Sequence, residues 1–190
     1  MGRRMRTYFG GQPVRFLTTT FNDWKTILIN EHYFNIVCDS LTFVCEKYVV
    51  DIICYVLMPN HIHLIGVFSK PSEVSGFMRD FKKFTSGELR SQLFKDNNIE
   101  LLKQLKVGDN KYKIWKDRFD DYALRDVRSV HTKINYIHLN PVRKGLIERA
   151  GDYEYSSAAF YLNQVEGKIK VTHFIDALGP GSTYGFGQIK

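Results

Sequence analysis

The sequence lacks an apolar run long enough to cross a membrane, and it has few cysteines. No stretch approaches the roughly 20 apolar residues of a transmembrane helix, and the basic start of the chain is not followed by the apolar core of a secretory signal. The three cysteines, Cys38, Cys45 and Cys54, form no CxxC pair and lie within apolar segments. We therefore expect buried free thiols, a cytoplasmic location and no membrane partner.

Acidic residues are fewer than basic ones. The 27 lysines and arginines outnumber the 20 aspartates and glutamates, which gives a net charge of +7 and an isoelectric point near 9.2. This excess favours a polyanionic partner, and nucleic acid before a membrane. The 190 residues are 44% hydrophobic, which is enough for one globular domain with a substantial core.

A β-hairpin is predicted in the middle of the chain. Segments 52–57 and 62–68 are rich in β-branched and apolar residues. Between them, Pro59 presets φ for the first central position of a turn, and Asn60 tolerates a left-handed backbone. The segments therefore read as two strands joined by a tight turn.

Two histidines lie two residues apart at the start of the second hairpin strand. Because side chains alternate across a strand, His61 and His63 share one face with Ile65, and Ile62 and Leu64 face the other way. Two neutral imidazoles on one face can bind a metal ion that keeps open coordination positions. The triplet alone is equally consistent with two exposed histidines on the solvent side of an antiparallel strand.

The order of the other elements predicts the fold class. We expect a strand at 13–21, helices at 33–50, from 71 into the 90s, at 127–140 and at 158–161, a loop at 96–110 and a strand at 111–124. With the hairpin, this order is typical of an α+β ferredoxin-like sandwich, with an antiparallel sheet and helices mainly on one face. We expect one domain over 1–162, and a tail over 163–190 that is mobile or contacts DNA.

The helix predicted at 127–140 carries a tyrosine outside its apolar stripe. On a helical wheel Tyr136 and Asn140 form an i, i+4 pair on the side opposite the stripe, and Lys133 lies beside them. His138 falls at the edge of the stripe, which favours a structural role. In the predicted order of elements this helix can lie across the hairpin, so that Tyr136 approaches His61 and His63.

Several cations are candidate phosphate contacts. They are Arg79, Lys82 and Lys83 on the helix after the hairpin, Lys116 and Arg118 among aromatic residues, Lys133, and a basic arm of Arg3, Arg4 and Arg6. Cations interleaved with aromatics suit stacking on single-stranded bases, and they equally suit a packed strand. An ordinary solvated helix face is the alternative for the first three.

Two long motifs resemble one known family. Segment 58–63 reads MPNHIH, segment 136–146 reads YIHLNPVRKGL, and residues 115–125 lie between them. In this order the motifs resemble the REP-associated tyrosine transposases, a branch of the single-tyrosine HUH transposases in the IS200-like superfamily. The resemblance extends from about residue 16 to residue 161. The chain differs at Tyr155, where the family has Trp, and past Leu162.

The resemblance implies a metal-assisted nuclease that acts on single-stranded DNA, often folded into hairpins, and it implies the same ferredoxin-like fold. His61 and His63 would bind a divalent ion, Mg²⁺ or Mn²⁺. Tyr136 would be the nucleophile that forms a 5′-phosphotyrosine link and leaves a free 3′-OH. Asn140 occupies the position of a third ligand, where related transposases often have Gln.

Two other functions remain open at the level of sequence. One is a DNA-hairpin binding protein whose catalytic residues have decayed, and this reading is weakened by the presence of both histidines and the tyrosine. The other is a metal-dependent hydrolase that uses a bound water, with Tyr136 structural. A monomer and a homodimer are both compatible with the sequence.

Overall fold

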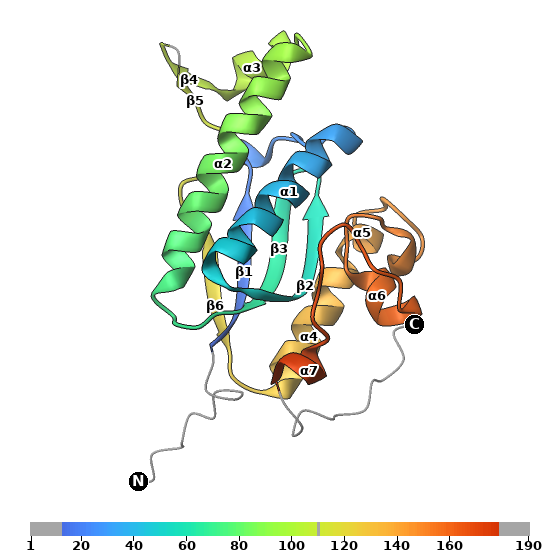
Figure 1. Ribbon diagram of the computed structural model, residues 1–190. Coiled ribbons are helices and arrows are strands. Elements are labelled where there is room, and N and C mark those ends of the chain that lie inside the picture. Colours follow the sequence, from blue (N-terminus) through green and yellow to red (C-terminus); the bar gives the residue numbers. More distant parts are fainter. Residues whose placement is uncertain (1–12, 110, 179–190) are drawn as a thin grey trace.

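A four-stranded antiparallel sheet lies at the centre of the computed structural model, which describes residues 13–109 and 111–178 (Figure 1). The strands are β1 (Val14–Thr20), β2 (Asp51–Met58), β3 (His61–Val67) and β6 (Asp120–Leu124), in the order β2-β3-β1-β6. The predicted first strand and hairpin are confirmed. The predicted basic arm of Arg3, Arg4 and Arg6 and the glycine-rich end of the tail lie outside the described residues.

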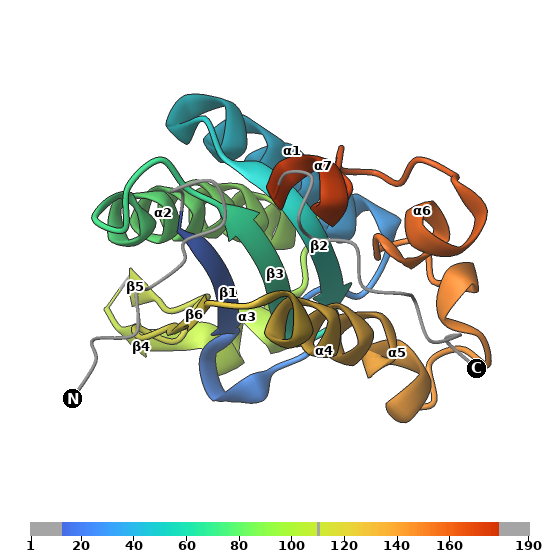
Figure 2. The same cartoon turned by 90° about the horizontal axis from the view of Figure 1, so that it is seen from below.

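The two longest helices cover one face of the sheet (Figure 2). They are α1 (Glu31–Tyr48) and α2 (Glu73–Lys95), and they pack on each other. The side chain of Asn30 begins α1 by accepting hydrogen bonds from the backbone N–H groups of His32 and Tyr33. Their apolar stripes, which include Val37 and Phe77, bury the side chains of β3 that point to this face.

The opposite face carries α4 (Val127–His138) and α7 (Phe174–Leu178). The side chain of Asp126 accepts a hydrogen bond from the Ser129 N–H and begins α4. Ile134 and Ile137 of α4 are completely buried in a core that also contains Ile65 of β3. The predicted α+β class and antiparallel sheet are confirmed, and helices lie on both faces of the sheet.

The segment between α2 and β6 differs from its prediction. The expected loop at 96–110 contains α3 (Ile99–Leu105) and β4 (Lys106–Gly108), because Leu102 and Leu105 are buried against the core. The expected strand at 111–124 is interrupted. Its start, β5 (Lys111–Tyr112), pairs with β4, and only β6 joins the main sheet. Between them Trp115 turns inward and stacks on Phe21.

The helix expected at 127–140 ends two residues early. α4 stops at His138, and a separate short helix, α5 (Asn140–Arg143), follows it. Pro141 has no N–H to continue the hydrogen-bond ladder, and it occupies the first turn of α5, where no such bond is needed. Asn140 therefore lies at the start of a new helix rather than at the end of the helix that carries Tyr136.

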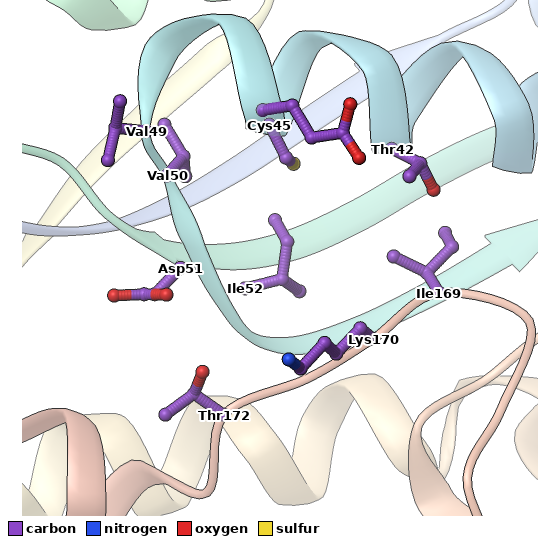
Figure 3. Close-up of a pocket in the computed structure, with 10 residues that line it drawn as sticks. Thr42, Cys45, Val49, Val50, Asp51, Ile52, Ile169, Lys170 and Thr172 are labelled. Carbon is purple, nitrogen blue, oxygen red and sulfur yellow. The ribbon is translucent and has the colours of Figure 1, made fainter.

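The last described segment runs along the edge strand β2. After the 3₁₀ turn η3 (Ala150–Asp152) and α6 (Ala158–Asn163), the chain returns to β2, where Thr172 N–H donates to the Ile52 carbonyl at 2.8 Å. Ile169 and Phe174 are buried, so packing on the sheet continues past the boundary expected at residue 162. Figure 3 shows the cavity of about 320 Å³ that this segment leaves beside Ile52 and α1. Within the described ranges, no helix is long and apolar enough to span a bilayer.

Candidate active site

The two histidines of β3 lie side by side on the face that α4 covers. His61 and His63 are each 5% exposed, and they line a cavity of about 490 Å³. Ile65 lies on the same face and Ile62 and Leu64 on the other, as strand alternation predicted. The exposed-histidine alternative for the triplet is therefore wrong.

A hydrogen bond to Nδ1 orients each imidazole. The Asn60 amide oxygen lies 2.6 Å from Nδ1 of His61, and the Thr18 hydroxyl lies 2.7 Å from Nδ1 of His63. Thr18 reaches His63 because the two residues are register partners on β1 and β3. An amide oxygen only accepts hydrogen bonds, so Nδ1 of His61 carries the proton. Nε2 of His61 is therefore left for a ligand, and Nε2 of His63 is left in the same way when Nδ1 of His63 donates to the Thr18 hydroxyl, an arrangement typical of metal-binding histidines.

Both imidazoles are held in the neutral form that binds metals. Burial lowers the pKa of His61 to about 4, helped by the nearby positive charge of Lys144. Burial also lowers the pKa of His63 to about 3, with further contributions from His61 and Lys133. At neutral pH neither ring needs to lose a proton before it binds a cation.

The tyrosine of α4 faces the histidine pair. The ring centroid of Tyr136 lies 5.2 Å from that of His63, and 37% of the Tyr136 side chain is exposed. Phe16 of β1 contacts both rings, stacking on His63 at 5.5 Å and meeting Tyr136 edge-on at 6.2 Å. The structure therefore brings Tyr136 and the imidazoles into one cavity, as the element order predicted.

Two cations flank Tyr136. The Lys133 ammonium nitrogen lies 5.3 Å from the centre of the Tyr136 ring and 4.4 Å from that of Phe16. The Arg143 guanidinium carbon lies 5.7 Å from the centre of the Tyr136 ring. The site thus has neutral histidines at its base and positive charge around the phenol, which suits a phosphate group.

Asn140 contributes a buried oxygen without a partner. Its side chain is 6% exposed and lines the same cavity, and its Oδ1 forms no hydrogen bond among the described residues. A buried polar atom of this kind is costly unless a ligand satisfies it. Across residues 13–109 and 111–178, no three of His, Cys, Asp or Glu come together as a metal site. Two imidazole nitrogens and this amide oxygen fit a divalent cation. The imidazole ligands make the site more suitable for Mn²⁺ than for Mg²⁺.

His138, the other histidine of the second motif, has a different environment. It is completely buried, its Nε2 lies 3.0 Å from Ser157 Oγ and 3.2 Å from Cys54 Sγ, and burial lowers its pKa to about 4. These contacts tie α4 to β2 and to the segment before α6. The geometry agrees with the structural role expected for His138.

The predicted phosphate contacts fall into two groups. Lys133 lines the histidine cavity, whereas Arg79, Lys82, Lys83 and Lys116 line a separate groove between α2 and segment 112–119. Arg79 pairs with the Asp80 carboxylate, and Lys82 donates hydrogen bonds to the carbonyl oxygens of residues 116, 117 and 118. Lys82 therefore links α2 to segment 116–118, whereas Arg79 pairs only with its neighbour on α2. Lys83, Lys116 and Arg118 are exposed.

Sequence reasoning missed several residues of the site. Thr18 and Phe16 line the site because β1 pairs with β3. No local pattern in the sequence predicts the register of that pairing. Asn60 was predicted only as a turn residue, although its place next to His61 could have indicated a second role. Trp24 lines the same cavity from the 3₁₀ turn η2 (Asn22–Trp24), with no motif around it.

The chain is similar to several known proteins. A protein of Haemophilus influenzae, provisionally named a REP-associated tyrosine transposase, is 28% identical over 116 residues, which cover 60% of this chain and 61% of that protein. The REP-associated tyrosine transposase of Escherichia coli is 22% identical over 152 residues, 80% of each chain. The structure of a REP-associated tyrosine transposase bound to a REP hairpin aligns with a TM-score of 0.61 at 20% identity, covering 93% of this chain and 95% of that one.

The match to the H. influenzae protein thus spans less than two thirds of that protein's length, and the likeness to the solved structure concerns the fold. Both named relatives belong to the branch that the two motifs indicated. The family profile described as "Transposase IS200 like" matches residues 19–140, well over half of the chain. The protein is therefore a member of the IS200-like transposase family.

Proposed function

We propose that the protein is a metal-dependent endonuclease and transposase that cleaves and rejoins single-stranded or hairpin DNA through a 5′-phosphotyrosine at Tyr136. The observation that carries the proposal is the meeting of Tyr136, two neutral imidazoles and the unpartnered Asn140 oxygen in one cavity. Hairpin DNA is the proposed substrate because the solved relative is bound to a REP hairpin and this chain carries an excess of positive charge. A DNA substrate also fits the expected cytoplasmic location.

His61, His63 and Asn140 are the proposed ligands of a divalent metal, Mg²⁺ or Mn²⁺. When bound, the ion would neutralise a non-bridging phosphate oxygen and make the phosphorus open to attack. Because both imidazoles are neutral, they would hold the ion without cancelling its charge. Thr18 and Asn60 keep the two rings oriented through their Nδ1 atoms.

Tyr136 is the proposed nucleophile. Its phenolic oxygen would lose its proton and form a bond to phosphorus as the bond from phosphorus to the 3′ oxygen breaks, and that oxygen would take up a proton and leave as a 3′-OH. The phenolate is also a reasonable leaving group, so the reverse attack by a 3′-OH would rejoin strands without an external energy source. Lys133 and Arg143 lie where they could stabilise negative charge at the phenol and the phosphate.

Further contacts to the DNA backbone are proposed at Lys133 in the cavity, at Lys83 and Lys116 on the second groove, and at the exposed Arg118. Arg79 and Lys82 have structural partners and are weaker candidates. Arg3, Arg4 and Arg6 remain proposed as a basic arm. Since Tyr136 approaches His63 of its own chain, we propose an active site formed within one subunit, in a monomer or in each half of a homodimer.

The proposal is tested with a labelled hairpin that carries single-stranded flanks, selected for binding from a random pool. After incubation with protein and Mn²⁺, a denaturing gel should show a covalent protein–DNA adduct. The adduct should disappear in Tyr136→Phe and when EDTA is added, while DNA binding by Tyr136→Phe persists. Tyr122→Phe, an exposed tyrosine in the same cavity, is the matched control and should retain the adduct.

The same gel separates the other functions. If Tyr136→Phe gives the same free cleavage products as the unaltered protein, the proposal is wrong and the protein is a hydrolase that uses a bound water. Binding without any cleavage by the unaltered protein in Mn²⁺ would favour a hairpin-binding protein without catalysis. Neither outcome is expected, because the residues needed for the covalent route come together in one cavity.

A further inference from the structure

Trp24 is an exposed aromatic residue beside the histidine pair. Its side chain is 57% exposed and lines the cavity, and its ring centroid lies 5.6 Å from that of His61, at an interplanar angle of 66°. The other tryptophan, Trp115, is 5% exposed, stacks on Phe21 and donates its indole N–H to the Thr85 hydroxyl. Of the two tryptophans, Trp24 is therefore the one with an aromatic face accessible to a ligand.

The backbone holds Trp24 in place although the side chain is not packed in the core. Asp23 and Trp24 have φ values of 52° and 56°, which place two consecutive non-glycine residues in the left-handed region. Such conformations are strained, and they concentrate at functional sites where the surrounding structure imposes them.

Hydrogen bonds anchor this turn on both sides. The Asn22 N–H donates to the Ile114 carbonyl at 2.8 Å, and the Ile27 N–H donates to the Pro59 carbonyl at 3.0 Å. Pro59 belongs to the turn that leads directly into His61. The position of Trp24 relative to the imidazoles is therefore fixed by backbone contacts rather than by burial of the indole.

We propose that Trp24 stacks on the nucleobase next to the phosphate that the histidine site holds. This inference rests on the proposed function, and it adds a base-binding residue to it. The indole is neutral and offers an aromatic face, which suits a base, while Lys133 and Lys144 line the same cavity and suit the phosphates. A base inside a duplex is already stacked on both sides, so the strand must be unpaired where it meets Trp24.

Stacking of this kind tolerates any base, because every base has an aromatic face. Trp24 would therefore contribute to affinity and to the position of the strand, and not to the choice of sequence. The residue would act on binding without touching the reacting atoms. A purely structural role, in which the indole only supports the His61 ring, makes a different prediction, since it affects metal binding and leaves base binding unchanged.

Intrinsic fluorescence tests the inference directly, because the chain has only two tryptophans and Trp115 is buried. The probes are an oligothymidylate of about ten nucleotides and an abasic oligomer of the same length, which keeps the phosphates and lacks the bases. The oligothymidylate should quench the emission, and the abasic oligomer should bind more weakly and leave the emission unchanged. In Trp24→Phe the quenching should disappear while affinity for oligothymidylate stays close to the original.

Trp24→Ala should weaken oligothymidylate binding by about 5- to 150-fold, the range that corresponds to the loss of one aromatic–base stack. Its affinity for the abasic oligomer and for Mn²⁺ should not change. Phe94→Ala is the matched control, because Phe94 is 52% exposed on α2 and lies outside the cavity, and it should bind both oligomers normally.

Equal oligothymidylate affinity in Trp24→Ala and the unaltered protein would overturn the inference, as would a loss of Mn²⁺ affinity with base binding intact. These outcomes are distinct from failure of the proposed function. If adduct formation at Tyr136 depends on oligonucleotide concentration in the same way in Trp24→Ala and in the unaltered protein, the stacking role fails and the proposed nuclease function stands. If no adduct forms in the unaltered protein but base-dependent quenching remains, the stacking site stands and the nuclease fails.

Discussion

The two faces of the central sheet are built from the same strands and have different chemistry. On the face under α1 and α2, β3 presents Ile62 and Leu64 to an apolar core. On the face under α4, β3 begins with His61 and His63 at one end and becomes apolar only at Ile65. One face is therefore apolar along the whole strand, and the other changes from a polar cavity to a core within a few residues.

This difference shows how a small sheet supports both stability and a reactive site. Side chains alternate, so a single strand can bury its even-numbered residues in a core and hold its odd-numbered residues in the cavity. The core fixes the backbone of β3, and the backbone fixes the imidazoles, whose Nδ1 atoms are also hydrogen-bonded. The rigidity that a metal site needs is thus supplied from the opposite face.

The largest expected effect is on catalysis and comes from the cavity face. His63→Ala should lower the single-turnover rate of adduct formation by about 10³-fold, since the loss of metal stabilisation amounts to several kcal/mol. His32→Ala, at an exposed histidine on α1, is the control and should leave the rate unchanged. A rate within a few-fold of the original in His63→Ala would show that the imidazole does not contribute to the reaction.

The core face should respond in stability instead. Leu64→Ala, one residue along β3 and 2% exposed, should lower the free energy of unfolding by about 2 to 5 kcal/mol, because it leaves a cavity in the core. Urea denaturation followed by circular dichroism measures this change. At a temperature where the variant is folded, its Mn²⁺ affinity should match that of the unaltered protein. A large loss of Mn²⁺ affinity in folded Leu64→Ala would contradict the claim that one face of the sheet provides stability and the other binds the metal.

The smallest effect is expected from two adjacent threonines of β1 that point to opposite faces. Thr18→Val removes the hydroxyl at Nδ1 of His63 and should weaken Mn²⁺ binding by about 10- to 100-fold in calorimetric titrations. The Thr19 hydroxyl is buried and has no hydrogen-bond partner among the described residues, so Thr19→Val should leave Mn²⁺ affinity unchanged and stability equal or slightly higher. Equal Mn²⁺ affinities in the two variants would contradict the orienting role of Thr18.

The parts of the fold that could be predicted from sequence are those with local signals. The alternation in segment 62–68 and the turn at Pro59 identified the hairpin and the shared face of His61 and His63. The apolar spacing after Asp126 identified α4 and placed Tyr136 outside its stripe. In each case neighbouring residues alone determine the pattern, so no knowledge of distant contacts is needed.

The parts that could not be predicted depend on distant contacts. Thr18 becomes a partner of His63 only through the register of β1 on β3, which the sequence of neither strand specifies. Asp23 tolerates a left-handed backbone, but the residue type does not predict the same conformation at Trp24. The segment expected as a loop at 96–110 contains α3, whose leucines are buried in a core that they share with Ile114 and Trp115.

The most direct measurement of the central claim is the chemical identity of the DNA-linked residue. Trypsin cleaves after Lys133 and after Arg143, which releases peptide 134–143. Tyr136 is the single tyrosine of this peptide. After incubation with Mn²⁺ and a cleavable strand, followed by trypsin and nuclease digestion, mass spectrometry should find this peptide carrying a nucleotide through a phosphate on Tyr136. A nucleotide attached to a different peptide, or cleaved DNA with peptide 134–143 unmodified, would contradict the assignment of Tyr136 as the nucleophile.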